Sequence, residues 1–101
     1  MVYLMMDKHG DTNLVKVGRA SHIPQRRANY RTHNPLAIMR SSCAGTGNAE
    51  LQCHAKLNQI GERIPRTEWW IVPDEVFETL YKEGMRYFYP NHQPIHFNEE
   101  F

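Results

Sequence analysis

The feature that most constrains the fold is a pair of short strand-like segments near the start of the chain. Residues 2–6 and 14–19 are rich in Val, Leu and Tyr. Residues 7–13 separate them, read Asp-Lys-His-Gly-Asp-Thr-Asn, and are nearly all turn formers. This pattern predicts an antiparallel hairpin with a loop of medium length.

A helix and a third strand are expected to follow the hairpin. Ser21 is a suitable N-cap, and Pro24 is tolerated because it falls in the first turn of the helix. The helix should run to about residue 32 and stop before Asn34-Pro35, since a residue that precedes proline disfavours helical backbone angles. Residues 36–44 then form the third strand candidate.

The second half of the chain predicts two more helices. Residues 45–48 end the third strand and cap the helix that follows over residues 49–59. Residues 68–72 form a short buried or edge segment. Pro73 and the two acids after it suit the first turn of a helix, which Gly84 ends.

The element order β-β-α-β-α-α predicts a small α+β fold, in which helices flank a three-stranded antiparallel sheet. Residues 1–84 would form the domain, and residues 85–101 an irregular, acidic and aromatic tail of the same domain. No apolar stretch is long enough to cross a bilayer, so no membrane association is expected. Two cysteines, Cys43 and Cys53, argue against a disulfide framework and for a cytoplasmic location.

Charge is distributed unevenly along the chain, although the net charge is only +1. Residues 13–48 hold six lysines and arginines and no acid, whereas residues 68–101 hold seven acids and two cations. Such a basic stretch is typical of a surface that faces a polyanion, and a solvated helix face is the alternative. The acidic tail is expected to fold over or flank this basic face and to weaken nonspecific binding.

Two charged residues suit phosphodiester chemistry. Arg26 carries a fork of donors that matches phosphate oxygens, and the alternative is an ordinary surface arginine. Glu50 is the only acid between Asp11 and Glu62, and a single carboxylate is enough to bind a hydrated Mg²⁺. The alternative for Glu50 is an acid that complements the dipole at a helix N-terminus.

Three further residues are candidates because of their positions. Tyr30 lies four residues after Arg26 and His54 four residues after Glu50, so each pair shares one helix face. The alternatives are a helix-packing tyrosine and a structural histidine. Tyr3, on the first strand, is either a core residue with its hydroxyl satisfied nearby or a member of the same site.

Together these residues resemble the motifs of the GIY-YIG nuclease superfamily, over roughly residues 1–73. The resemblance is to the small phage-type branch, in which the second motif reads Lys-Val/Ile-Gly. The residues that carry it are Tyr3 in Val2-Tyr3-Leu4, Lys16-Val17-Gly18, Arg26, Tyr30, Glu50, His54 and Glu68-Trp69-Trp70.

The resemblance implies a metal-dependent endonuclease that hydrolyses phosphodiester bonds in DNA with Mg²⁺ or Mn²⁺. Arg26 would neutralise developing charge, Tyr3 would position or activate the nucleophilic water, and Glu50 would hold the metal ion. Lys16 stands where the family has its second tyrosine, which leaves the general base open between Tyr3, a water on the metal and a neutral Lys16. Lys16 as a simple phosphate contact is the further alternative.

The basic residues are expected to bind the DNA backbone without reading its sequence. This set consists of Lys16, Arg19, Arg27, Arg31 and Arg40. The alternative function is a module that kept the fold, lost the reaction, and binds nucleic acid or a protein. The acidic and aromatic C-terminal region is the candidate surface for a homodimer or a protein partner.

Two other constellations compete with this interpretation. Trp69-Trp70 is a candidate platform for stacking bases, although alternating orientation favours core packing for at least one of the two. A zinc site would draw its ligands from Cys43, Cys53, His54 and His33. The absence of any Cys-x-x-Cys pair in the sequence argues against zinc.

Overall fold

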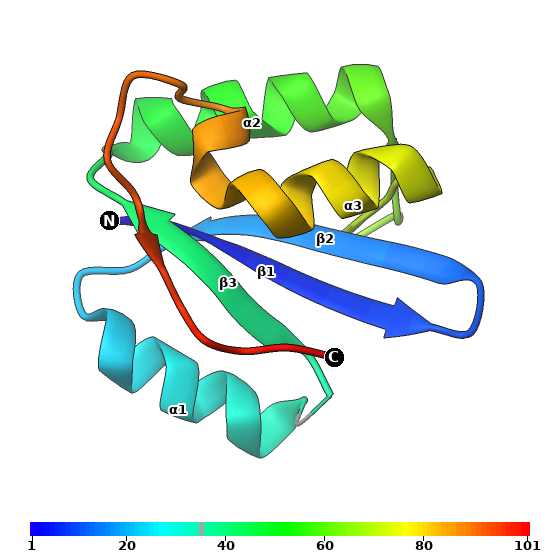
Figure 1. Cartoon of the computed structure of the whole chain (residues 1–101), viewed down its shortest axis with the longest axis horizontal. Helices are drawn as coiled ribbons and strands as arrows, with labels where there is room; N and C mark the ends of the chain where they lie inside the picture. Colours follow the sequence, from blue (N-terminus) through cyan, green and yellow to red (C-terminus); the bar gives the residue numbers. More distant parts are fainter. Residues whose placement is uncertain (35) are drawn as a thin grey trace.

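The computed structural model describes residues 1–34 and 36–101. Pro35, which was expected to stop the first helix, lies outside the described residues. The chain forms a six-stranded antiparallel sheet in the order β4-β5-β2-β1-β3-β6, with α1 on one face and α2 and α3 on the other (Figure 1). The strands are β1 Val2–His9, β2 Thr12–Arg19, β3 Ile38–Cys43, β4 Glu62–Arg63, β5 Trp70–Ile71 and β6 Ile95–His96. The helices are α1 Ile23–His33, α2 Gly47–Ile60, α3 Asp74–Glu83 and the 3-10 helix η1 Gly84–Tyr87.

The α+β class is confirmed, but the predicted three-stranded sheet is wrong. Strands β4, β5 and β6 contain two residues each, which is too short to produce an alternating pattern in the sequence. Strands β5 and β6 form because the outer edges of β2 and β3 offer free backbone groups, and β4 then pairs with the outer edge of β5. Tertiary pairing therefore adds strands that local sequence does not indicate.

The hairpin of β1 and β2 is longer than expected, and its loop is shorter. Pairing runs from Val2 opposite Arg19 to His9 opposite Thr12, so only Gly10 and Asp11 remain as the turn. Gly10 has a φ of 59°, which a glycine adopts at little cost in a tight hairpin turn.

Two polar residues assigned to the loop are strand residues because distant partners satisfy them. Asp7 is 1% exposed and accepts a hydrogen bond from Asn34 Nδ2 at 3.1 Å. Asn13 donates to Asp74 Oδ1 at 2.6 Å and to the Val72 carbonyl at 3.3 Å. Turn-forming residues can occupy strands when tertiary structure supplies such partners.

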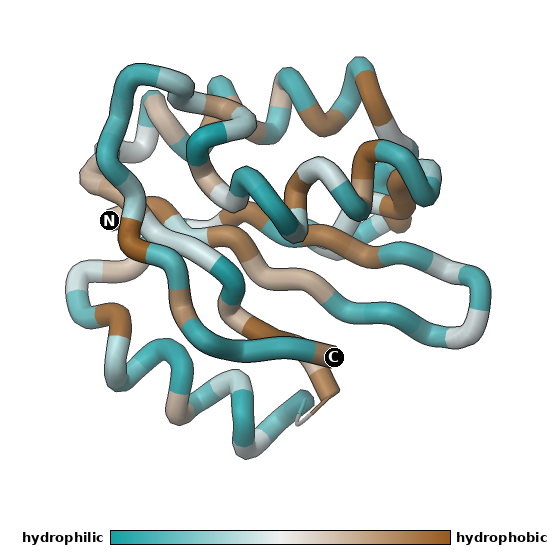
Figure 2. Tube along the Cα trace, in the orientation of Figure 1, coloured by the Kyte–Doolittle hydropathy of each residue, from teal (hydrophilic) through white to brown (hydrophobic). Residues whose placement is uncertain are grey.

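The two faces of the sheet are covered very differently. On the α2 and α3 face, alternate residues of β1 and β2 join a large core with Leu57, Trp70, Leu80 and Met85. On the α1 face, the buried cluster is small and includes Tyr3. Helix α1 buries none of its residues, and Figure 2 shows it as largely hydrophilic. The α1 face of the sheet is therefore covered by a helix that contributes little apolar surface to the core.

The C-terminal residues return to the sheet after η1. Strand β6 pairs with β3, and the Phe97 amide then donates to the Arg40 carbonyl at 3.0 Å. The last residues continue past β3 (Figure 1): Glu99 contacts Arg27 of α1, and the Phe101 ring lies 5.7 Å from the Phe77 ring of α3. Within residues 1–34 and 36–101, no helix has both the length and the apolar character to span a membrane.

Candidate functional site

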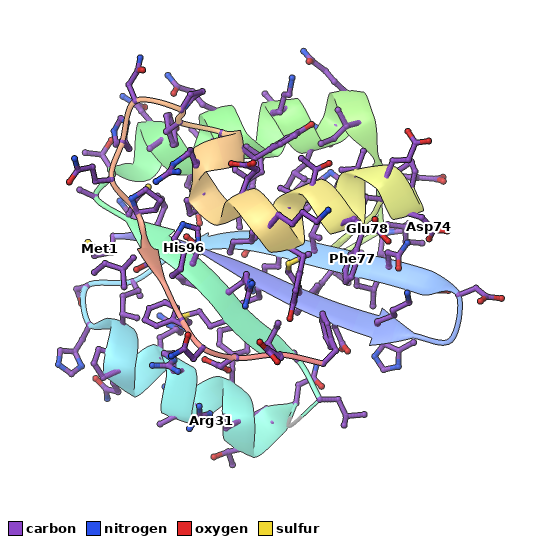
Figure 3. All side chains as sticks on the ribbon, viewed as in Figure 1. Met1, Arg31, Asp74, Phe77, Glu78 and His96 are labelled. Atoms are coloured by element: carbon purple, nitrogen blue, oxygen red, sulfur yellow. The ribbon has the colours of Figure 1, made fainter. Side chains whose placement is uncertain are left out.

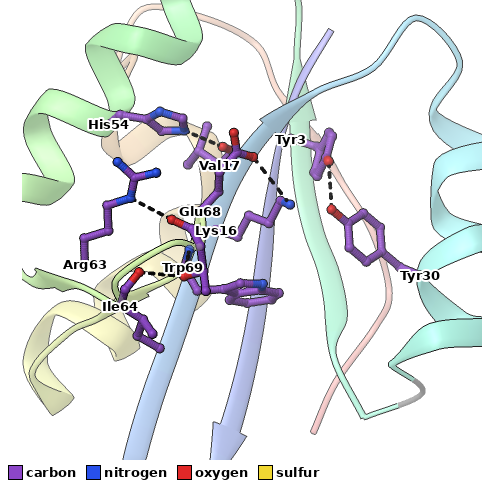
Figure 4. A network of polar contacts seen from close by, with 10 residues as sticks. Tyr3, Lys16, Val17, Tyr30, His54, Arg63, Ile64, Glu68 and Trp69 are labelled. Carbon is purple, nitrogen blue, oxygen red and sulfur yellow. Dashed lines mark hydrogen bonds and ion pairs between the residues drawn. The ribbon is translucent and has the colours of Figure 1, made fainter.

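A pair of tyrosines joins the sheet to α1. The hydroxyls of Tyr3, on β1, and Tyr30, on α1, lie 3.1 Å apart, and their rings meet edge to face at a centroid distance of 6.0 Å (Figure 4). Tyr3 is 2% exposed, whereas Tyr30 is half-buried. The sequence motif at Tyr3 and the helix position of Tyr30 are thus brought together by the α1 face of the sheet.

Gly18 provides the space that Tyr3 needs. The two residues are paired across β1 and β2, and a Cβ added at Gly18 would lie 2.5 Å from Tyr3 Cζ. No real side chain tolerates that separation, so the glycine of the Lys-Val-Gly motif is required by close approach of the ring.

Lys16 lies beside the tyrosine pair. Its Nζ is 5.4 Å from the centroid of the Tyr30 ring and 3.6 Å from Glu68 Oε2 (Figure 4). Trp69, next to Glu68, packs against the same small cluster as Tyr3. The sequence analysis did not predict Glu68 as a site residue. The Glu-Trp-Trp motif, which contains Glu68, was the sequence feature that could have indicated it.

The Tyr3 phenol is held in its protonated form. Burial raises its pKa, and the hydrogen bond with Tyr30 raises it further. The nearby positive charge of Arg26 acts in the opposite direction, while Glu68 adds to the increase. At neutral pH Tyr3 therefore serves as a hydrogen-bonding hydroxyl and not as a phenolate.

Arg26 projects from the exposed side of the first turn of α1. It lines one hollow with Asn29, Tyr30 and His33, and a second with Arg19 and the residues that precede α2. Among residues 1–34 and 36–101, the Arg26 guanidinium forms no ion pair. An exposed guanidinium at the mouth of two hollows is available to bind an anion.

Glu50 lies in the first turn of α2, where its amide donates to the Thr46 carbonyl at 3.2 Å. The same end of α2 is flanked by Arg19, whose Nη1 would be 3.1 Å from a Cβ added at Gly47. In the described part of the chain, the half-buried Glu50 carboxylate has neither an ion pair nor a side-chain hydrogen bond. An unpaired carboxylate fits the role of a single ligand for a hydrated divalent ion.

His54 lies on the opposite face of the sheet from the tyrosine pair. Its Nε2 is 2.7 Å from the Val17 carbonyl, to which it donates (Figure 4), and its ring packs on Trp70 at a centroid distance of 4.9 Å. Trp70 in turn donates from Nε1 to Asn58 at 2.9 Å. These contacts make His54 a support for the backbone of the Lys-Val-Gly motif, because they occupy the ring without reaching Tyr3 or Tyr30.

The basic residues predicted to bind DNA have unequal surroundings. The Arg40 guanidinium stacks on the Tyr81 ring at 3.9 Å and donates from Nε to the Tyr81 carbonyl at 2.7 Å, so the protein itself engages it. Arg27 and Arg31 contact Glu99 of the tail. Arg19 remains exposed, and Lys16 has its partner in Glu68.

The cysteines do not form a metal centre with histidine. Cys43 and Cys53 are free and buried, and no cluster of three or more His, Cys, Asp or Glu side chains occurs among the residues that the structure describes. Burial raises the pKa of the Cys53 thiol to about 12, and the thiol donates weakly to the Tyr89 hydroxyl at 3.9 Å. Both thiols are therefore packing groups in this fold.

Comparison with known protein families identifies the chain. The family model of the T5orf172 domain matches residues 1–84, the part that carries β1 through α3 and the tyrosine pair. No curated protein sequence and no solved structure matches the chain. The protein therefore belongs to the T5orf172 domain family, a phage domain family related to the GIY-YIG nucleases.

Proposed function

We propose that the chain is a metal-dependent endonuclease that hydrolyses phosphodiester bonds in DNA in the manner of the GIY-YIG nucleases. The observation that carries this proposal is the tyrosine pair, with hydroxyls 3.1 Å apart, beside Lys16 and within electrostatic reach of Arg26. Hydroxyl donors and cations converge there on a face that the rest of the core leaves thinly covered. Such a set suits an attack by water on a phosphate.

In this reaction the oxygen of a water molecule attacks phosphorus, and the bond from phosphorus to one sugar oxygen breaks. The water gives up a proton to a base, and the leaving oxygen finishes protonated. Arg26 binds the phosphate oxygens and neutralises charge as it develops. The Tyr3 hydroxyl, kept protonated by burial and by Tyr30, orients the water or the phosphate through hydrogen bonds.

Lys16 and Glu50 complete the proposed site. Glu50 would enter it from the first turn of α2, next to the hollow that Arg19, Arg26 and Thr46 line. Lys16 would contact a phosphate oxygen once the substrate competes with Glu68, whose side chain is 51% exposed. Glu50 would hold Mg²⁺ or Mn²⁺ as its single carboxylate ligand. The divalent ion, when bound, supplies positive charge that stabilises the phosphate in its transition state.

Cleavage of supercoiled plasmid in Mg²⁺ or Mn²⁺ tests the proposal. Wild-type protein should nick the plasmid, and an Arg26→Ala/Glu50→Ala double variant should not. Glu78→Ala is the matched control for Glu50, because Glu78 is exposed on α3 and forms no ion pair in the described part of the chain. Mn²⁺ binding is measured from the electron paramagnetic resonance spectrum of the ion. It should be lost in Glu50→Ala and kept in Glu78→Ala. Nicking by wild type no faster than by the double variant would refute the catalytic function.

A non-catalytic module that binds DNA or a protein is the second candidate. Two observations favour it: Glu68 already pairs with Lys16, and burial keeps Tyr3 protonated. This function predicts that wild type binds a labelled duplex without nicking it in either metal. It also predicts that the only effect of Arg26→Ala is weaker binding of the duplex. Measuring plasmid nicking and duplex binding on the same variants therefore separates the two candidates.

A further inference from the structure

Glu99 of the C-terminal tail is bound by donors from α1 and β3. Arg27 approaches one oxygen of its carboxylate with both Nη2, at 2.6 Å, and Nε, at 2.8 Å. Arg31 Nη2 is 3.9 Å from the other oxygen, which also accepts the Met39 amide at 3.4 Å. The Glu99 side chain is only 13% exposed. The tail thus places an anion in a site built from two arginines and a backbone amide.

The segment that carries Glu99 is held to the fold by its backbone and its aromatic side chains, independently of the Glu99 carboxylate. Strand β6 contains two residues, and Arg40 Nη1 donates to the carbonyls of Glu99, at 3.0 Å, and Phe97, at 3.4 Å. The Arg27 guanidinium also lies 4.3 Å from the Phe97 ring centroid. The Phe101 ring, at the end of the chain, lies 5.7 Å from the Phe77 ring and 6.1 Å from the Tyr81 ring of α3. Only a side-chain movement of Glu99 is needed to free the arginines.

The arginines that hold Glu99 lie next to the candidate active site. Arg27 follows Arg26 directly, and Arg31 follows Tyr30, so the two pairs occupy neighbouring stripes along α1. Arg31 is 62% exposed and is labelled on α1 in Figure 3. A DNA strand that brings a phosphate to Arg26 therefore passes close to Arg27 and Arg31.

We propose that Arg27 and Arg31 form a subsite for a backbone phosphate of DNA, which the Glu99 carboxylate occupies in the free protein. The proposal rests on the proposed function, because it takes DNA as the ligand. Arginine binds carboxylate and phosphate with the same fork of donors, so one anion replaces the other without rebuilding the site. When DNA binds, its phosphate replaces the Glu99 carboxylate at the two arginines. Glu99 lowers the affinity for DNA, because free energy is needed to displace its carboxylate.

Removing the Glu99 charge tests the exchange, with the adjacent acid as a matched control. Glu100 is exposed and forms no ion pair among the described residues, and Glu100→Gln changes the net charge by the same amount as Glu99→Gln. Affinity for a fluorescein-labelled duplex is measured by anisotropy at low salt, in EDTA to prevent cleavage. Glu99→Gln should bind about two to five times more tightly than Glu100→Gln, the range expected for freeing a partly exposed ion pair.

A double-mutant cycle with Arg27 separates the subsite from general charge effects. Arg27→Gln should weaken binding more in the Glu99→Gln background than in the wild type, by the same factor of about two to five. Thermal unfolding of each variant shows whether it is folded. If Glu99→Gln does not fold, Glu99→Asp keeps the charge, shortens its reach and should give a smaller gain in affinity.

Equal affinities of the Glu99→Gln and Glu100→Gln variants would overturn the proposal and leave Glu99 as a structural clamp. A cycle without coupling between Glu99 and Arg27 would also overturn it. These outcomes are distinct from failure of the proposed function, in which wild type neither binds nor nicks DNA. If no variant binds the duplex, both proposals fall.

Discussion

The two faces of the sheet differ in what they contribute: one holds the main core, and the other holds the tyrosine pair of the candidate site. The face under α2 and α3 buries Leu57 and Leu80 completely, together with the large ring of Trp70. The face under α1 instead carries the tyrosine pair beside Lys16, beneath a helix with no buried residue. Apolar burial is the main source of stability in a chain of this size, so one face holds the fold together. The other face is left free to carry polar chemistry.

The largest test of this division compares one aliphatic truncation on each face. Leu57→Ala should cost about 2 to 5 kcal/mol of unfolding free energy, because it leaves a cavity in the main core. Ile23→Ala removes a half-buried side chain from α1 and should cost about 1 kcal/mol or less. Urea denaturation of both variants measures the two costs. Equal losses would show that the faces share the stability.

A second test concerns the fit between Gly18 and Tyr3. Gly18→Ala should destabilise the fold by about 1 to 3 kcal/mol, since the added Cβ forces the ring out of its place. In a Tyr3→Ala background the same substitution should cost little, because the obstructing ring is gone. A cost that is unchanged in that background would mean that Gly18 is required for another reason.

The pH dependence of stability sharpens the account of the tyrosine pair. The folded-state pKa of Tyr3 is raised above the unfolded value of 10.0. The contribution of Tyr3 to the free energy of unfolding is therefore complete below about pH 10 and declines as the pH rises further. Tyr30→Phe removes the hydrogen bond, which should cost about 1 kcal/mol and lower the Tyr3 pKa toward its ordinary value. Ultraviolet titration of phenolate absorbance follows this change. Tyr3 titrating unchanged in Tyr30→Phe would contradict the paired arrangement.

The smallest effect on stability is expected at Glu68. Its pair with Lys16 is half-exposed and screened, so Glu68→Gln should change the unfolding free energy by no more than about 0.5 kcal/mol. It should nevertheless strengthen DNA binding, because Lys16 no longer has a competing carboxylate. Glu62→Gln, an exposed acid on β4, is the control for charge alone. Identical DNA affinities of the two variants would remove Glu68 from the site.

Elements with a strong local pattern were predictable from sequence. The hairpin, the third strand and the three α-helices follow from apolar segments, proline and glycine positions, and helix-start residues. Strand β5 lies within the short buried or edge segment expected at residues 68–72, whereas β4 and β6 were not predictable, because two paired residues leave no periodic signal. Asp7 and Asn13 were predicted to lie in the loop but lie in strands, since their hydrogen-bond partners Asn34 and Asp74 are distant in the chain.

The sequence indicated candidate residues for the site but not the contacts among them. The Tyr3 and Tyr30 motifs were identified, yet their contact depends on how α1 crosses the sheet. Lys16 meets Glu68 because β5 returns to β2, which no local pattern indicates. The position of His54 behind the sheet follows from the packing of α2, whereas its sequence spacing from Glu50 suggested a role at the site itself.

The central claim is that the tyrosine pair, Lys16 and Arg26, with Glu50 at the start of α2, perform phosphodiester hydrolysis, and one rate comparison tests it most directly. Single-turnover nicking of plasmid in Mn²⁺ is measured for Arg26→Ala and for Arg86→Ala, an exposed arginine of η1 with no ion pair in the described residues. The account predicts that Arg26→Ala loses about 100-fold or more of the rate, the usual cost of removing a transition-state charge donor. Arg86→Ala should keep the wild-type rate. Equal rates for the two variants would contradict the account.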